Sequence, residues 1–279
     1  IKFGLDTFGD IQLDDSGVPV TAAQTIRNLV EQGVLADSIG LDNINIGEHH
    51  RDDFAVSAPD TVLAGIATRT SKIGLGTGVT VLSSDDPVRV YERFATVDAL
   101  SNGRAEITAG RGSFIESFPL FGFDLKQYEI LFEEKLKLLV ELVKEKPVTW
   151  SGKTRAALIN QEVYPKTERG RIPVRVGVGG TPESVVRAAR LGLQMALAII
   201  GGNPSRFSVF ANLYRESLIE FKQADLPISI HSPGHISETD EQAREEQWPH
   251  YQKMISRIGA ERGWPAPTKE QFIAEIEHG

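Results

Sequence analysis

Short apolar segments alternate with helical patterns along most of this 279-residue sequence. Strand candidates rich in Val, Ile and Leu are residues 1–8, 43–47, 73–82, 104–109, 172–178, 194–200 and 227–231. Helical patterns occupy residues 20–40, 58–70, 87–100, 128–145, 181–191, 205–224 and 240–258. Repetition of this kind indicates right-handed βαβ units around a parallel sheet that is buried on both faces. Seven such units predict an α/β fold, a (β/α)8 TIM barrel, as a single domain over residues 1–279.

The repeat is broken in two places. After Trp264-Pro265-Ala266-Pro267 there is one short helical run, residues 268–277, and no eighth apolar strand. Because a seven-stranded barrel leaves open edges, we expect the protein to continue past Gly279. The second break is an insertion after the fourth unit, residues 147–171, with strand-like and turn residues. It is either a lid over a substrate site or a hairpin packed on the barrel rim.

Composition excludes several classes of function. The formal net charge is −8 and no dense Lys/Arg cluster is present, which argues against a nucleic-acid or anionic-membrane partner. The chain has no cysteine, so disulfides, thiolate nucleophiles and Cys-ligated metal centres are excluded. Neither an apolar run of transmembrane length nor a signal-peptide pattern is visible, and we expect a cytoplasmic protein.

Glycine-rich segments follow three of the predicted strands. In Gly76-Thr77-Gly78-Val79 the side chains are too small for covalent chemistry, but they allow a planar ring or an unusual backbone conformation, or simply ease packing in a buried strand. The loop Gly110-Arg111-Gly112-Ser113 offers a guanidinium and backbone N–H groups that suit a phosphate. The third segment, Gly179-Gly180-Thr181-Pro182-Glu183-Ser184, opens a helix, and helix N-termini bind anions. Thr181 can also serve as the helix N-cap.

Two histidines end the second predicted strand, in Glu48-His49-His50. Imidazole titrates near neutral pH, so a histidine here can exchange protons with a bound ligand, whereas Glu48 is expected to orient its neighbours. Alternatively, the two histidines have only a structural role at the end of the strand. A metal site built from these residues with His231 and His235 is a third possibility. Adjacent strand residues point to opposite faces, which disfavours two ligands for one ion.

Other conspicuous residues are expected to be structural. Phe114, Phe118, Phe121 and Phe123 should pack the loop after the fourth strand, with one or two of the rings lining a substrate pocket. Asp98 and Arg104 lie in a helix-to-strand turn, where they are expected to pair with each other.

In their order along the chain, these motifs resemble the bacterial luciferase-like flavin monooxygenases, a family of (β/α)8 barrels. The resemblance is carried by Gly47-Glu48-His49-His50, by Gly76–Val79 through Pro87-Val88-Arg89, by Asn102-Gly103-Arg104 to Gly112, and by Gly177 to Pro182. It implies His49 as general acid/base and a cis peptide at Gly78–Val79 behind the flavin ring. Flavin-phosphate contacts are implied for Arg111, Gly179, Gly180, Thr181 and Ser184. A substrate pocket is expected at Phe8, His50 and Phe114.

The resemblance also implies a reaction. Reduced FMN, supplied by a separate flavin reductase, and molecular oxygen would act on a small organic substrate in a homodimeric enzyme. No nicotinamide fingerprint is present, and because no cysteine lies near Gly110, light emission is not expected. Three alternatives stay open: a deazaflavin-dependent hydride-transfer enzyme of the same fold, a metal-dependent barrel hydrolase that uses the histidines, and a flavin-binding protein without turnover.

Overall fold

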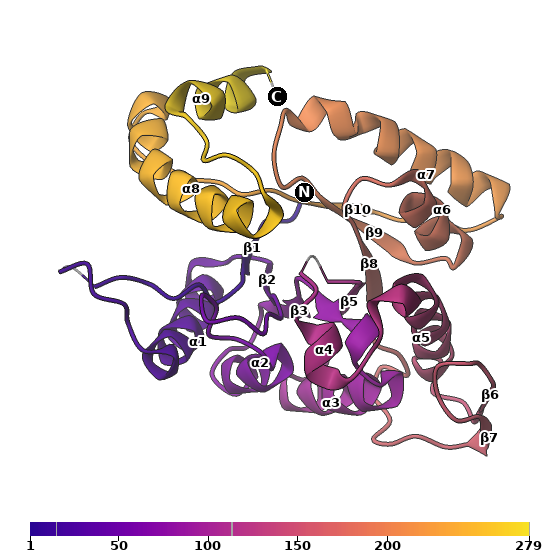
Figure 1. Cartoon of the computed structure of the whole chain (residues 1–279). Coiled ribbons are helices and arrows are strands. Elements are labelled where there is room, and N and C mark those ends of the chain that lie inside the picture. Colours follow the sequence, from indigo (N-terminus) through magenta and orange to yellow (C-terminus); the bar gives the residue numbers. More distant parts are fainter. Residues whose placement is uncertain (15, 113, 279) are drawn as a thin grey trace. The chain divides into compact units, whose positions relative to one another are not determined.

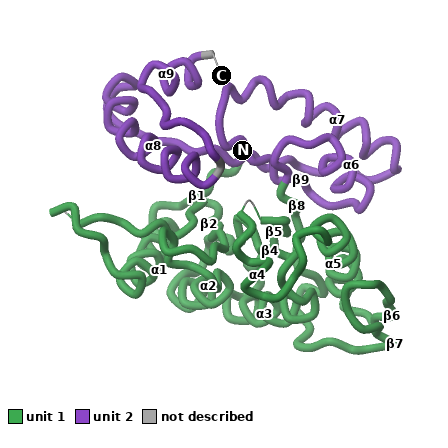
Figure 2. The backbone as a smooth tube through the Cα atoms, in the orientation of Figure 1, with its two compact units in different colours: residues 1–177 green, residues 178–279 purple. Residues whose placement is uncertain are grey.

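The structure is a computed structural model that describes residues 1–14, 16–112 and 114–278 (Figure 1). The chain divides into two compact units, residues 1–177 and residues 178–279 (Figure 2). Each unit is an alternation of strands and helices, as the sequence pattern predicts. The two units are described separately below.

Unit 1 begins with three parallel strands in the order β1-β2-β3. They are β1 (Gly4–Thr7), β2 (Asn43–Ile46) and β3 (Gly74–Thr77). Helices α1 (Ala22–Ile39) and α2 (Pro59–Ala67) connect them and pack against each other. Ile44, Ile46 and Leu75 are fully buried in this region. Parallel pairing places the carboxyl ends of all three strands at one edge of the sheet, where loops carry function in α/β folds.

Unit 1 also contains a second group of parallel strands. It contains β4 (Thr80–Val81), β5 (Ile107–Gly110) and β8 (Val174–Val178), whose last residue is the first of unit 2. A parallel bridge from Leu75 to Ala105 joins β3 to the segment before β5. The accompanying helices are η1 (Leu82–Ser84), α3 (Pro87–Leu100), α4 (Ser117–Phe121), η2 (Leu125–Gln127) and α5 (Tyr128–Leu142). The single strand predicted at residues 73–82 is thus divided into β3 and β4.

Local sequence signals set the helix ends. The Thr21 side chain accepts a hydrogen bond from the Gln24 amide at the start of α1, and Gly40 ends that helix with a φ of 86°. Asp86 accepts from the Val88 amide at 2.8 Å, and Pro87 occupies the first turn of α3. Both arrangements satisfy backbone groups that a helix end leaves without a partner.

Arg104 joins α2, β3 and the turn before β5. It donates hydrogen bonds of 2.7–3.0 Å to the backbone carbonyls of Ser101, Ile73, Ala67 and Thr70. The expected Asp98–Arg104 pair is wrong, because Asp98 pairs with Arg169 at 2.5 Å and the Arg104 guanidinium is directed at carbonyl groups. Both residues nonetheless have structural roles.

Residues 147–171 contain an antiparallel hairpin of β6 (Val148–Trp150) and β7 (Leu158–Gln161). Its connecting turn donates backbone hydrogen bonds to Glu134 of α5, and Arg155 pairs with Asp86 at the start of α3 at 2.9 Å. These contacts hold the segment against two helices of unit 1. A lid function for this segment stays a prediction.

Unit 2 contains the parallel pair β9 (Gln194–Ala198) and β10 (Ile228–His231). Its helices are α6 (Pro182–Arg190), η3 (Pro204–Phe207), α7 (Ser208–Glu220), α8 (Asp240–Arg262) and α9 (Lys269–His278), and α6 packs on α7. Within the described part of the chain, no helix has the length and hydrophobicity needed to cross a membrane.

Candidate active site

His49 is enclosed by aromatic rings from three loops of unit 1. Its imidazole stacks on Phe54 at 4.3 Å between centroids, while Phe8 and Phe114 approach it edge-on at 5.0 and 5.2 Å. Phe8 follows β1, Phe54 belongs to the loop after β2, and Phe114 to the loop after β5. His49 is 8% exposed. The structure therefore brings together three of the predicted residues, Phe8, His49 and Phe114.

Burial among these rings lowers the pKa of His49 to about 4, because an apolar environment disfavours the charged imidazolium. The carboxylate of Asp53 acts in the opposite direction, and the electrostatic interactions with Arg51 and His50 add to the lowering. At neutral pH the imidazole is therefore uncharged. In this state it can accept a proton, which is the basic half of the acid/base role expected from the sequence.

Glu48 orients His50, as expected from the sequence. One carboxylate oxygen accepts a hydrogen bond from His50 Nε2 at 3.0 Å, and the other accepts from the Val81 amide at 2.9 Å. The His50 ring also contacts the edge of Phe121 at 5.0 Å between centroids. Glu48 thereby links the loop after β2 to β4.

The Gly78–Val79 peptide bond is cis, which confirms the bond implied by the family resemblance. Gly110 and Gly177 leave space for the side chain of Val79, the second residue of this peptide bond. A Cβ at Gly110 would lie 2.3 Å from Val79 Cγ2, and one at Gly177 would lie 2.9 Å from Val79 Cγ1. A third glycine, Gly47, lies under Phe8, where a Cβ would come within 2.3 Å of the ring. The strand ends at Gly47 and Gly78 thus present backbone without side chains.

These features fit a planar cofactor. Side-chain-free backbone at Gly78 allows close approach of a flat ring, and a Cβ added there would meet nothing nearer than 3.5 Å. The neighbouring rings of Phe8, Phe54 and Phe114 form an apolar cluster around His49. These surfaces agree with the planar flavin ring that the resemblance implies.

Arg111 is held at the start of α5. Its guanidinium pairs with Glu129 and lies over the Tyr128 ring at 5.2 Å. The Tyr128 hydroxyl donates to the Gly112 carbonyl at 3.3 Å. A phosphate bound by Arg111 must therefore compete with the Glu129 carboxylate. Ser113, part of the same predicted phosphate loop, lies outside the described residues.

The second predicted phosphate loop belongs to unit 2. Thr181 occupies the N-cap position of α6, but its side chain makes no capping bond to the backbone. Its hydroxyl instead lies 2.8 Å from that of Ser184. Gly180 has a φ of 104°, and a Cβ there would lie 3.7 and 3.8 Å from the rings of Phe210 and Phe207. A Cβ at Gly179 would have no atom within 4 Å.

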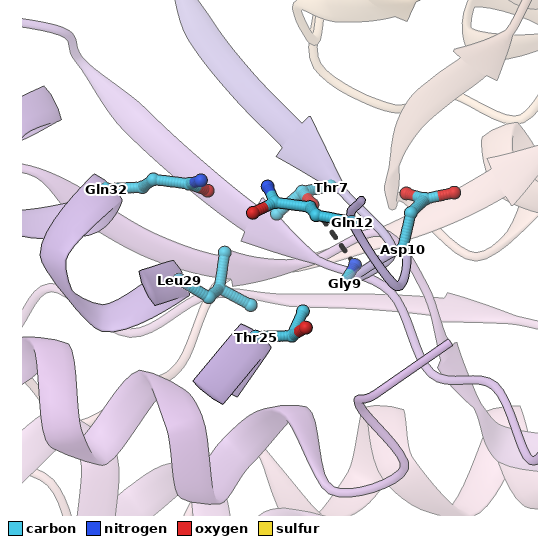
Figure 3. A pocket seen from close by; sticks show the side chains of 7 residues that line it. All are labelled: Thr7, Gly9, Asp10, Gln12, Thr25, Leu29 and Gln32. Carbon is cyan, nitrogen blue, oxygen red and sulfur yellow. Dashed lines mark hydrogen bonds between the residues drawn. The ribbon is translucent and has the colours of Figure 1, made fainter. Parts of the chain in front are cut away.

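A small cavity lies elsewhere in unit 1, between α1 and the loop after β1 (Figure 3). It measures about 50 Å3 and its lining includes Thr7, Gln12 and Thr25. Thr25 Oγ1 is buried and has no hydrogen-bond partner among the described residues. The volume suits a few water molecules and is too small for an organic cofactor.

A metal centre receives no support from the geometry. Among residues 1–14, 16–112 and 114–278, no three His, Asp or Glu side chains are grouped so that they could hold a metal ion. His235, one of the suggested ligands, has its Nε2 atom 2.7 Å from Glu246 Oε2.

Sequence reasoning missed Phe54, Arg51 and Glu116. Phe54 provides the stacking partner of His49, and the Arg51 guanidinium lies 4.5 Å above the Phe114 ring. Glu116 Oε1 is 3.9 Å from His49 Nδ1. An aromatic residue five positions after His49 is a weak signal for Phe54. No sequence pattern relates Glu116 to His49, because the two are brought together from different loops.

The chain belongs to the luciferase-like monooxygenase family, whose model matches residues 7–275. The predicted family and the predicted TIM-barrel class of α/β fold are thereby confirmed. The chain is similar in fold to a solved structure of the oxygenating constituent of 3,6-diketocamphane monooxygenase from Pseudomonas putida in complex with FMN. The two structures superpose with a TM-score of 0.80 at 16% sequence identity, and the match covers 100% of this chain and 80% of that one.

Two curated relatives have names that describe different reactions. An N-acetyl-S-alkylcysteine monooxygenase from Bacillus subtilis is 31% identical over 233 residues, 81% of this chain and 65% of that protein. An F420-dependent glucose-6-phosphate dehydrogenase from Amycolatopsis mediterranei is 30% identical over 163 residues, 55% of this chain and 48% of that protein. The matched parts are less than two thirds of either relative's length.

Proposed function

We propose that this protein is an oxidoreductase that uses reduced FMN and molecular oxygen to oxidise a small organic substrate. The observation that carries the proposal is the aromatic enclosure of His49 beside the strand ends at Gly47 and Gly78, where no side chain projects. Membership of the luciferase-like monooxygenase family supports it. FMN, when bound, supplies the electrons and the oxygen chemistry, and the protein supplies binding, orientation and proton handling.

The proposed binding roles follow the residues one by one. The backbone at Gly78 and Val79 supports the flavin ring, since no side chain projects from Gly78. Arg111 is assigned to the phosphate, where it exchanges its pairing with Glu129 for the ligand. The loop residues Gly179, Gly180, Thr181 and Ser184 are also assigned to phosphate binding, through backbone amides and hydroxyl groups at the start of α6.

His49 is the proposed proton acceptor. At neutral pH its uncharged imidazole offers a nitrogen lone pair to a proton of the bound ligand, and the phenyl rings of Phe8, Phe54 and Phe114 shield it from solvent. Phe8, Phe114 and His50 are proposed to line the substrate pocket. Replacement of His49 by alanine should leave FMN affinity nearly unchanged while it lowers turnover. Equal loss of both would contradict this role.

The proposal extends to partners and location. We infer that a separate reductase supplies reduced FMN, that the enzyme works as a cytoplasmic homodimer, and that neither nucleic acid nor a membrane is a partner. The negative net charge argues against nucleic acid and against an anionic membrane as partners. A coupled assay with a flavin reductase tests the supply of reduced FMN, and gel filtration tests the homodimer.

A deazaflavin-dependent hydride transfer is the second candidate. It is favoured by the similarity to the F420-dependent dehydrogenase from Amycolatopsis mediterranei. A flavin-binding protein without turnover uses the same binding surfaces and is distinguished by the absence of substrate oxidation. The metal-dependent hydrolase receives no support from the grouping of the described His, Asp and Glu side chains.

The test is an anaerobic titration of the full chain with reduced FMN and with reduced F420, followed by admission of oxygen. Binding of reduced FMN, with oxygen consumption that increases when a substrate is added, supports the monooxygenase. Preference for F420 moves the protein to the hydride-transfer branch. Binding of neither coenzyme overturns the proposal.

A further inference from the structure

The loop after β5 places a carboxylate at one edge of the His49 ring. Glu116, the residue before α4, has its Oε1 atom 3.9 Å from His49 Nδ1. The same segment supplies Phe114 against His49 and Phe121 against His50. One short segment therefore contacts both His49 and His50. Of its three side chains that approach them, Glu116 is the one that can accept a hydrogen bond from an imidazole N–H.

The other charged or titratable groups facing His49 come from its own loop. They are Asp53, Arg51 and His50. Asp53 pairs with Arg51 at 3.0 Å, and Arg51 lies over Phe114. Glu48 is engaged by His50 and by the Val81 amide. Glu116, in contrast, comes from the loop after β5, and its carboxylate lies within ion-pair distance of His49 Nδ1.

The present separation is too long for a hydrogen bond. A bond of normal length requires Oε1 to move about 1 Å toward Nδ1. The Glu116 side chain is 24% exposed, whereas the His49 side chain is 9% exposed and held by three rings. Rotation of the glutamate is therefore the simpler movement.

We propose that Glu116 is a positioning residue for His49, whose carboxylate accepts a hydrogen bond from Nδ1–H and leaves Nε2 as the proton-accepting atom. A neutral imidazole carries one N–H, and the hydrogen bond made by one nitrogen determines the state of the other. The proposal deepens the proposed function and rests on it for the proton-accepting role of His49.

Nitrogen-15 NMR of the flavin-free full chain at neutral pH tests the proposal, because it reports which imidazole nitrogen carries the proton. The chain has six histidines, and the His49→Gln variant identifies the signals of His49. We expect the Nδ1–H form in the unmodified protein and a change of about tenfold in the tautomer ratio toward Nε2–H in Glu116→Leu. Glu116→Gln retains an acceptor oxygen and should restore the original ratio.

Asp53→Asn is the matched control, since it removes a carboxylate near His49 that is paired with Arg51. The proposal is overturned if Glu116→Leu leaves the ratio unchanged, or if Asp53→Asn changes it instead. If the leucine variant does not fold, Glu116→Asp takes its place, because its shorter side chain loses reach and should shift the ratio as well. These readouts need no flavin, so failure of FMN binding and failure of this inference are separate results.

Discussion

Replacement of Arg104 by lysine tests how the turn before β5 is held to α2 and β3. Arg104 makes five hydrogen bonds from three nitrogens, four to backbone carbonyls and one to the Thr70 hydroxyl at 3.0 Å. A lysine ammonium keeps the charge, but its three N–H groups radiate from one point and cannot reproduce the planar fork. At least two bonds are lost, and carbonyl groups at the end of α2 are left without a donor.

The expected cost follows from these bonds. A hydrogen bond to a charged group contributes about 1.5–3 kcal/mol, so the loss of two predicts a decrease of about 3–6 kcal/mol in the free energy of unfolding. Urea denaturation followed by circular dichroism measures this decrease. Arg89→Lys is the control, because Arg89 is 74% exposed and pairs only at the surface with Glu92, at 3.0 Å. Its effect should stay below about 0.5 kcal/mol. If Arg104→Lys behaves like this control, the reasoning is refuted.

Two further predictions concern packing and pH. Gly110→Ala should destabilise unit 1 by about 1–3 kcal/mol because its Cβ overlaps Val79, and Val79→Ala in the same chain should recover most of the loss; additive effects in urea denaturation would contradict this contact. Burial lowers the pKa of Lys135 to about 8, below the 10.5 of an unfolded chain, so folding disfavours its charged form. The free energy of unfolding should therefore rise between pH 8 and pH 10.5, and Lys135→Met should remove most of that rise in denaturation curves measured at pH 7.5 and 9.5. An unchanged pH dependence in the variant would assign the rise to other groups.

The elements that carry a strong local pattern were predictable from the sequence. Strands β2 and β8 carry a β-branched apolar residue, Ile or Val, at every second position, and Pro87 after Asp86 marks the start of α3. The cis bond at Gly78–Val79 was accessible only through the family resemblance, because no local rule requires it. No local pattern in residues 73–82 predicted their division into β3 and β4.

Contacts between distant segments were not predictable. The hydrogen bonds of Arg104 end on carbonyl groups, which leave no mark in the sequence, so a pairing with the nearby Asp98 was the simpler and incorrect expectation. The Arg111–Glu129 pair and the approach of Glu116 to His49 depend on how the loop after β5 folds. Side-chain chemistry indicated which residues could react, and the tertiary structure determined which of them meet.

We propose that this chain binds FMN for oxygen chemistry. The most direct measurement is an anaerobic competition in which the full chain is equilibrated with equal concentrations of reduced FMN and reduced F420, and the bound coenzyme is separated by ultrafiltration and quantified. We expect the bound coenzyme to be predominantly FMN, and we expect Gly110→Ala, whose Cβ displaces Val79, to lower the amount bound. Predominant binding of F420, or no retention of either coenzyme, would contradict the account.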